Sequence, residues 1–423
     1  MPAPILTSHP SPERPSARKR LNHGTAEEWG QHGAIAGVVS TQDFSIRVLR
    51  DPAELEWLAE DLARLSASCA EPNVFYEPWM LLPALKAFGK DKTFLFVLVF
   101  LDRDGKGAHL YGFFPFEIVE QVRGIALRKA RLWSYLYFHW CSPLLRSGYE
   151  QECLEAFFAW AASTGSPCSL FEFGFLSVDS PLSERLIDLA NRKGFPAYAT
   201  DLHSRAVLYQ PGSLQEAGCA LAGRRLKEFR RLERRLAEQG ALACEQLTDE
   251  NAVEEWIEGF LDLEASGWKG RCGTALACTE AGREFFSNAV RSAFRQGQLM
   301  MLRLRLNDRV LAYKCNFLSG RGAFAFKIAY DEEYGRFSPG VLLELENIRR
   351  FRNLTGVEWM DSCASADHFM ANRLWGGRRT LHTIWIATGG RQSRLRLWLL
   401  AVWKSLKHSL KSLLSKPVVR SNQ

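Results

Sequence analysis

The sequence predicts a mixed α/β protein built on mostly antiparallel sheets flanked by helices, and three observations predict it. Residues 299–350 read as three short strands followed by a helix. Residues 94–100 form an almost continuous apolar run, which is typical of a strand buried on both faces. The order of strands and helices expected in residues 44–210 recurs in residues 224–390, without a strong repeat of sequence. We therefore expect two units of one architecture in tandem.

The stretch 299–350 holds the clearest local signals. A strand over 299–306 is turned by Asn307 and Asp308, which tolerate the left-handed backbone of tight hairpins. A strand over 310–318 returns, and a third follows over 323–330. We expect a helix over 341–350, with Ser338 as its cap and Pro339 at its first position. Free N–H groups at such a helix start can hold a phosphate.

The third strand and its loop read Phe-Lys-Ile-Ala-Tyr-Asp-Glu-Glu-Tyr, with Ser-Pro-Gly three residues later. This pattern resembles the second half of a GNAT acyltransferase domain, and more narrowly the branch of CelD-like cellulose-biosynthesis proteins and FemAB-like transferases. The resemblance implies a loop that cradles the pyrophosphate of acyl-CoA. The usual loop is richer in Gly and begins with Gln or Arg. An ordinary strand-to-helix connection is the structural alternative. The implied cofactor-binding residues are Lys327, Arg336, Ser338 and Gly340.

A second phrase of that branch is Glu-Ala-Ser-Gly-Trp-Lys-Gly at residues 264–270. It places a carboxylate, an indole and an ammonium beside flexible glycines. Glu264 is a candidate acid or base, and Trp268 and Lys269 are candidates for contact with the acceptor. A helix end with a packed Trp is the equally weighted alternative.

Two further phrases resemble the same branch. Residues 73–80 read Asn-Val-Phe-Tyr-Glu-Pro-Trp-Met, and the resemblance places Trp79 on the substrate side of the cleft. Packing in an aromatic cluster is the alternative. Residues 372–377 read Asn-Arg-Leu-Trp-Gly-Gly, where the branch carries a basic residue, a role that Arg373 can fill.

Candidate acid and base groups lie near strand ends. Asp361 ends a short strand over 357–361, and such positions often display active-site groups. His368 lies close to Asp361 and Asp367, with a surface or capping role as the alternative. Tyr330 and Tyr334 are candidates to protonate a leaving thiolate. Cys363 lacks the His and Asn signature of a cysteine nucleophile.

Charge and composition exclude several classes. The net charge is +7, but residues 391–423 hold eight Lys or Arg and no acid, which leaves 46 basic against 47 acidic groups in the preceding 390 residues. We therefore expect no general DNA-binding surface. Ten cysteines without metal-ligand spacing favour a reducing cytoplasm and no metal. No apolar run is long enough to span a membrane, and no secretory signal is visible.

The expected organisation has four parts: a disordered segment over 1–43, a first GNAT-like domain over 44–210, a second over 222–390 and a basic amphipathic tail over 391–423. A basic helix over 223–240 opens the second domain, either as a solvated face or as a contact for an anion. The tail pattern fits a helix on an anionic membrane surface, with docking on the protein itself as the alternative.

These inferences lead to an N-acyltransferase that moves an acyl group from acetyl-CoA or another acyl-CoA to an amine. By family analogy the acceptor is an amino sugar or glycan precursor of the cell envelope or exopolysaccharide. The expected location is the cytoplasm, peripheral to the inner face of the membrane. Two alternatives stay open: a FemAB-like aminoacyl transferase that acts on a cell-wall peptide, and a non-enzymatic accessory protein of polysaccharide synthesis.

Overall fold

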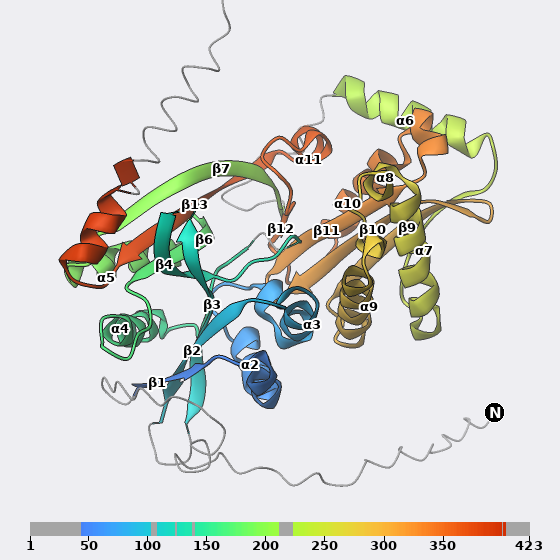
Figure 1. Ribbon diagram of the computed structural model, residues 1–423. Coiled ribbons are helices and arrows are strands. Elements are labelled where there is room, and N and C mark those ends of the chain that lie inside the picture. Colours follow the sequence, from blue (N-terminus) through green and yellow to red (C-terminus); the bar gives the residue numbers. More distant parts are fainter. Residues whose placement is uncertain are drawn as a thin grey trace, which may run out of the picture.

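The computed structural model describes residues 44–102, 108–122, 125–137, 140–210, 223–399 and 401–402 (Figure 1). The predictions for residues 1–43, for the linker after Gln210 and for most of the tail lie outside these ranges. We refer to residues 44–210 as the N-terminal half and to residues 223–387 as the C-terminal half. The predicted domain boundaries stay a prediction, because a single sheet runs through both halves.

The N-terminal half alternates strands with helices, as its apolar patterning predicts. Helix starts carry strong local signals: Asp51 makes a capping box with Glu54, and Ser180 caps the helix that begins at Pro181. In chain order the elements are β1 (Phe44–Leu49), η1 (Pro52–Leu58), α2 (Ala59–Ala67), η2 (Val74–Tyr76), α3 (Pro78–Phe88), β2 (Thr93–Leu101), β3 (His109–Val122), β4 (Ile125–Leu132), β5 (Leu144–Leu145), α4 (Glu150–Ala161), β6 (Leu170–Ser177), α5 (Pro181–Arg192) and β7 (Ala197–Tyr209).

The C-terminal half repeats this plan, and its hairpin turns at Asn307, which has the positive φ that the sequence predicts. In chain order the elements are α6 (Gly223–Ala237), β8 (Leu242–Gln246), η3 (Glu250–Ala252), α7 (Val253–Ser266), α8 (Trp268–Arg271), η4 (Leu276–Cys278), α9 (Glu280–Arg295), β9 (Leu299–Leu306), β10 (Arg309–Ser319), β11 (Gly322–Tyr330), η5 (Glu332–Phe337), α10 (Pro339–Phe351), β12 (Trp359–Asp361), α11 (Phe369–Leu374) and β13 (Gly377–Ala387). The predicted mixed α/β class with a mostly antiparallel sheet is confirmed.

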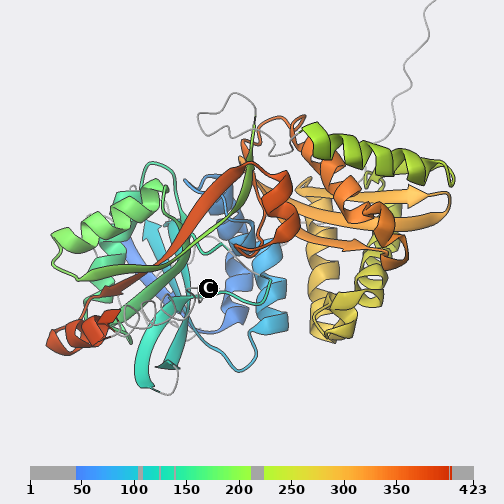
Figure 2. The same cartoon turned by 90° about the horizontal axis from the view of Figure 1, so that it is seen from above.

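The two halves exchange their last strands. The sheet order is β1-β2-β3-β4-β6-β13-β7-β12-β11-β10-β9-β8, so β13 pairs with β6 and β7 pairs with β12. The two exchanged strands also pair with each other, and they cross the top of the molecule as the long green and red ribbons of Figures 1 and 2. α3 and α9 pack together beneath the sheet. Each half therefore completes the sheet of the other.

The middle of the sheet opens between β11 and β12. These strands pair in parallel only where residues 322–324 face residues 359–361, and β11 then continues to Tyr330 without β12 beside it. A β-bulge at Phe326 shifts the register against β10. Because of the bulge, Phe326 and Lys327 both reach the face covered by α7 and α9, where Phe326 stacks on Phe286 and Lys327 reaches Glu264.

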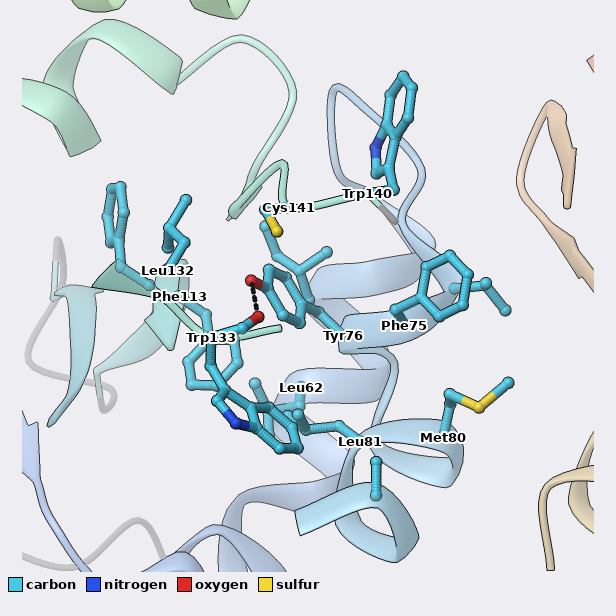
Figure 3. Close-up of a cluster of buried hydrophobic side chains, with 14 of the residues drawn as sticks. Leu62, Phe75, Tyr76, Met80, Leu81, Phe113, Leu132, Trp133, Trp140 and Cys141 are labelled. Carbon is cyan, nitrogen blue, oxygen red and sulfur yellow. Dashed lines mark hydrogen bonds between the residues drawn. The ribbon is translucent and has the colours of Figure 1, made fainter. Parts of the chain in front are cut away.

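The corresponding place in the N-terminal half is filled. β4 and β6 also pair in parallel over only two residues, but β4 ends at Leu132 instead of continuing. The chain that follows packs Trp133 into the core, where its carbonyl accepts a hydrogen bond of 2.9 Å from the hydroxyl of Tyr76 (Figure 3). Phe113 and Cys141 complete this cluster of buried side chains. The strand therefore ends at Leu132, where the chain turns away into aromatic packing.

Candidate active site

The opening between β11 and β12 leads into a cavity of about 210 Å³, which we call the β11 cavity. Its residues come from both halves of the chain and from both faces of the sheet. Tyr137 is the contribution of the N-terminal half. The C-terminal half contributes Lys269, Lys314, residues 325–328, Glu344, residues 362–364, His368, Met370, Ala371 and Trp375. The free edge of a strand therefore faces a cavity rich in ammonium groups.

Glu264 is held behind this cavity by two lysines. One oxygen of its carboxylate, Oε1, lies 2.9 Å from Lys327 Nζ and 3.1 Å from Lys269 Nζ. The other oxygen accepts the N–H of Leu276 at 2.8 Å. Burial raises the pKa of Glu264, but the two ammoniums outweigh burial and hold that pKa below its ordinary value. Two cations share one anion, so this cluster carries a net positive charge.

Lys314 and Glu344 form a second charged pair in the β11 cavity. Lys314 on β10 lies 2.8 Å from Glu344 on α10, and both side chains are buried. The other oxygen of Glu344 accepts hydrogen bonds from Asn347 at 2.8 Å and from the indole of Trp375 at 3.1 Å. This network fixes the carboxylate against the cavity wall, as buried charges require.

His368 also lines the β11 cavity, and it caps a helix there. Its Nδ1 accepts the N–H of Ala371 at 3.2 Å, at the start of α11. Burial lowers the pKa of His368, and the nearby ammonium of Lys314 lowers it further. Because Nδ1 accepts this hydrogen bond it carries no proton, which leaves Nε2 as the donor atom of the ring. The structure thus combines the predicted capping role with a place at the site.

The loop before α10 differs from the predicted cap. Ser338 stands at the N-cap position but has a left-handed backbone with φ 54°, and its side chain makes no capping hydrogen bond, so that prediction is wrong. Pro339 opens the helix as predicted. A Cβ on Gly340 would lie 3.3 Å from the ring of Tyr330, so the helix start packs closely on the end of β11. Arg336 is exposed and its guanidinium stacks on Phe337.

Tyr330 and Trp268 lie beside each other next to Glu264. Together they line a small recess that adjoins the β11 cavity at Lys269 and Ile328. Trp268 is 48% exposed, and its backbone N–H donates to Glu332 at 2.7 Å. Tyr334 lies under the guanidinium of Arg309, at 5.1 Å from ring centre to carbon. The structure brings Tyr330, Trp268 and Lys269 together, with Tyr334 in the next loop.

Three predicted site residues have other surroundings. Asp361 is fully buried between Arg205, at 2.7 Å, and Arg379, at 3.0 Å. Burial raises its pKa, but the two arginines outweigh burial and lower that pKa, so this geometry favours an anchor over a general base. Trp79 is buried and donates to Glu77 at 2.8 Å. Arg373 is exposed and its guanidinium lies over the ring of Phe369.

Sequence reasoning missed Lys314 and Glu344, although the sequence carries a signal for both. Lys314 and Asn316 are polar residues on one face of an otherwise apolar strand. Glu344 and Asn347 lie on the same helical stripe as the buried Ile348 and Phe351. The two stripes meet, since Lys314 pairs with Glu344 and Asn316 donates to Asn347 at 2.9 Å. Polar residues inside apolar stripes therefore mark this wall.

Residues 223–370 match the family model of the acetyltransferase (GNAT) domain. This part of the chain is a GNAT acetyltransferase domain. The match spans the β11 cavity up to Met370, and it confirms the predicted class of N-acetyltransferase or acyltransferase. No curated protein matches the chain in sequence.

Several solved structures are similar to the chain at low sequence identity. The C-terminal domain of a putative lysylphosphatidylglycerol synthetase from Agrobacterium fabrum has 14% identity and a TM-score of 0.46, covering 80% of this chain and 95% of that one. FemX has 11% identity and a TM-score of 0.47, with 78% and 95% covered. A tandem GNAT protein of the clavulanic acid pathway has 12% identity and a TM-score of 0.38, with 81% and 98% covered.

Within the described residues, no group of three or more His, Cys, Asp or Glu side chains is placed to hold a metal ion. Among the same residues, no helix combines the length and the apolar character needed to cross a membrane.

Proposed function

We propose that the chain is an N-acyltransferase that takes its acyl group from acyl-CoA and passes it to an amine. The observation that carries this proposal is the free edge of β11 beside the β11 cavity. In such a reaction the amine attacks the thioester carbonyl, and negative charge develops on the carbonyl oxygen. The strand edge supplies backbone N–H groups, and the two lysines on Glu264 supply a net positive charge close to that edge.

The attacking amine must also lose a proton. Glu264 and Asp361 have lowered pKa values, which makes them weak bases, and neither of them lines the β11 cavity. Glu344 is the carboxylate that directly lines the β11 cavity, and we assign it the role of proton acceptor. His368 offers a donor through Nε2, and Tyr330, next to the start of α10, is the candidate to protonate the leaving thiolate.

The phosphates of acyl-CoA require positive charge at the other end of the site. We place them at the start of α10, beside Gly340 and Arg336, where the helix dipole favours anions. The helix α6 packs against η5 and α10, next to this place. Its cations are exposed and leave room for phosphate contacts; they are Lys227, Arg230, Arg231, Arg234 and Arg235.

Calorimetric titration of the full chain with acetyl-CoA and longer acyl-CoAs tests the proposal. We expect saturable binding that Arg336→Glu weakens at least tenfold, since the charge reversal acts at the phosphate end. Lys193→Glu, an exposed cation in the N-terminal half, is the matched control and should bind like the wild type. Absence of binding by the wild type would overturn the proposal. Equal weakening by both variants would place the phosphates elsewhere.

The exposed basic helix α6 also favours a second candidate, transfer of an amino acid from aminoacyl-tRNA. Rows of exposed Arg and Lys suit a nucleic-acid backbone, and binding through them weakens steeply with salt. Competition decides between the donors. If uncharged tRNA displaces a fluorescent acyl-CoA at low salt, the two share the site. If tRNA binds while acyl-CoA does not, the second candidate replaces the first.

The acceptor and the location are also proposals. An amino sugar or glycan precursor remains the acceptor class to screen first. We further propose that residues 391–423 bring the enzyme to an anionic membrane surface. Leu397 anchors the helical backbone of residues 391–399 in the protein, while Leu395, Trp398 and Leu399 are each more than half exposed. Sedimentation with phosphatidylglycerol vesicles tests this, with phosphatidylcholine vesicles and Trp398→Glu as controls.

A further inference from the structure

The β11 cavity carries more positive than negative charge in the part of the chain that the structure describes. Three lysines line it, Lys269, Lys314 and Lys327, together with one carboxylate residue, Glu344. Glu264 does not line the cavity but adds a second negative charge from behind it, through its contacts with Lys269 and Lys327. Three positive charges therefore stand against two negative ones, and the excess lies at the cavity.

The charges of the three lysines influence one another. Burial lowers the pKa of Lys269, although Glu264 raises it, and the charges of Lys327 and Lys314 lower it further. The pKa of His368 is also lowered, first by burial and then by Lys314 and Lys269. The ammoniums therefore lie close enough to repel one another, and an anion placed among them would relieve that repulsion.

Two of these ammoniums keep N–H groups for a ligand. An ammonium has three N–H donors. Lys327 donates one to Glu264 and has no other hydrogen-bond acceptor within the described residues. Lys269 donates one to Glu264 and one to the carbonyl of Ile328, which leaves its third. Lys269 is the more accessible of the two, with a side chain 21% exposed against 11% for Lys327.

The chemistry of acyl transfer alone does not balance this charge. The oxyanion exists only while the acyl group is transferred, so the enzyme with bound substrates keeps the excess. An amine acceptor arrives as an ammonium, which an excess of positive charge repels. A substrate that brings its own anion avoids that repulsion. The walls of the cavity also include Phe326, Ile328 and Met370, which suit a short carbon chain.

We propose that the β11 cavity binds a carboxylate group of one of the two substrates, at the ammoniums of Lys269 and Lys327. A carboxylate carries one negative charge, which matches the excess, and its oxygens only accept hydrogen bonds. A phosphate monoester carries more than one negative charge at neutral pH and would exceed it. Two molecules can supply the group: an amino acid as the acceptor, or a dicarboxylic acyl group on the donor. That the carboxylate belongs to a substrate rests on the proposed function.

The test uses the full chain and two matched probes, trifluorobutyrate and its amide, followed by ¹⁹F NMR at low salt. The probes share one carbon chain, and only the acid is charged at neutral pH. We expect the signal of the acid to shift saturably at millimolar concentration, while the signal of the amide does not shift. Equal shifts of both probes, or no saturable shift of the acid, would overturn the proposal. This comparison uses the wild type and does not depend on the folding of a variant.

Lys269→Met tests whether the acid binds in the β11 cavity. The variant leaves two ammoniums against two carboxylates, so the excess charge is gone. We expect it to weaken binding of the acid at least tenfold, while Lys269→Arg, which keeps the charge, binds like the wild type. Lys86→Met, which removes an exposed ammonium of the N-terminal half, is the control and should also bind like the wild type. Wild-type affinity in Lys269→Met would overturn the assignment, and Lys327→Met takes its place if it does not fold.

Competition with the bound acid identifies the substrate that carries the group. Displacement by succinyl-CoA but not by butyryl-CoA, which lacks the carboxylate, assigns the group to the acyl donor. Displacement by alanine but not by alaninamide assigns it to the acceptor. Equal displacement by both members of each pair, or none, would overturn the assignment to a substrate. If the acid binds but no acyl-CoA does, the proposed function fails and the anion site stands. If acyl-CoA binds but the acid does not, only this inference fails.

Discussion

The two halves of the chain share one plan but treat the middle of their sheets in opposite ways. In the C-terminal half β11 runs past its short pairing with β12, and charged side chains line the space that opens. In the N-terminal half β4 stops at Leu132, and Trp133, Tyr76 and Phe113 fill the corresponding place. The difference teaches that six further residues of strand separate a cavity lined by charged side chains from a packed core.

Buried ion pairs follow the same contrast. Lys129 and Glu172 bridge β4 and β6, with Lys129 held over the ring of Trp385. Lys327 and Glu264 have a similar chemistry in the C-terminal half, yet Lys269 adds a second cation, and Lys327 and Lys269 line a cavity. The Lys129–Glu172 pair lies within a packed core. The cluster of Glu264 with Lys327 and Lys269 instead has an excess positive charge beside a cavity.

The largest change in stability is expected from Asp361, which connects β12 to the exchanged strands β7 and β13 through Arg205 and Arg379. Asp361→Asn removes the carboxylate that pairs with Arg205 and Arg379 and leaves two buried guanidiniums without their anion. Loss of one partner in a buried ion pair costs about 3–5 kcal/mol. We expect urea denaturation to show a loss of that size. A loss below about 1 kcal/mol would contradict the anchoring role, and Asp188→Asn, in an exposed pair, is the control.

Asp361 should also make the stability of the fold depend on pH, with a loss of stability as the pH falls. The pKa of Asp361 is lower in the folded chain than in the unfolded chain, where it is about 3.9. Its stabilising effect is therefore fully present above the unfolded pKa and is lost as pH falls through the folded pKa. Urea midpoints measured between pH 6 and pH 3 should fall more steeply for the wild type than for Asp361→Asn. Parallel curves would argue against this linkage.

Lys327→Ala tests the open side of the comparison. Loss of one of the two ammoniums that hold Glu264 beside the strand edge should lower kcat/KM on the order of 100-fold, as expected for a group that stabilises developing charge. Lys129→Met, in the filled half, should reduce stability but leave the turnover of the folded protein unchanged. Similar kinetic losses in both variants would mean that the two pairs do not differ in role.

Glu344→Gln sharpens the assignment of the base. The amide can still accept from Trp375 through its oxygen, but it cannot take a proton from the amine. We expect kcat to fall by about 10²- to 10³-fold, as for loss of a general base, with a smaller change in KM. A pH–rate profile that keeps its acidic limb in this variant would place the base elsewhere.

The smallest change in stability is expected in the aromatic cluster of the N-terminal half. Tyr76→Phe removes the hydrogen bond to the carbonyl of Trp133 and keeps the ring. A net loss of about 1 kcal/mol in unfolding free energy follows from one neutral hydrogen bond. Activity should not change. A kinetic defect in this variant would show that the aromatic cluster influences the site at a distance.

Much of the fold could be predicted from the sequence because its signals are local. Asn307 turned the meander as expected, and Pro339 opened α10. The opening at β11 could not be predicted, because it depends on where a distant strand stops pairing. Lys327 was assigned to the cofactor, but only the bulge at Phe326 brings it to Glu264.

The exchanged strands were also beyond prediction. β7 and β13 have strand patterns that any neighbouring strand could accept, so the choice of partner is made by long-range contacts. Asp361 was recognised as a residue at a strand end, but its two arginines are on those exchanged strands, at positions 205 and 379. A strand-end carboxylate reads the same in sequence whether it meets a substrate or a pair of guanidiniums.

The exchange of strands has a consequence for how the protein is made. A ribosome releases β6 long before it has translated β13, the strand that covers the edge of β6. Domains usually fold during synthesis, with the N-terminal domain first. Here the sheet of the N-terminal half is incomplete until residues 377–387 have been synthesised. Until then β6 presents an open edge, which invites pairing with other chains. Nascent chains stalled before residue 377 should therefore be the species most dependent on chaperones.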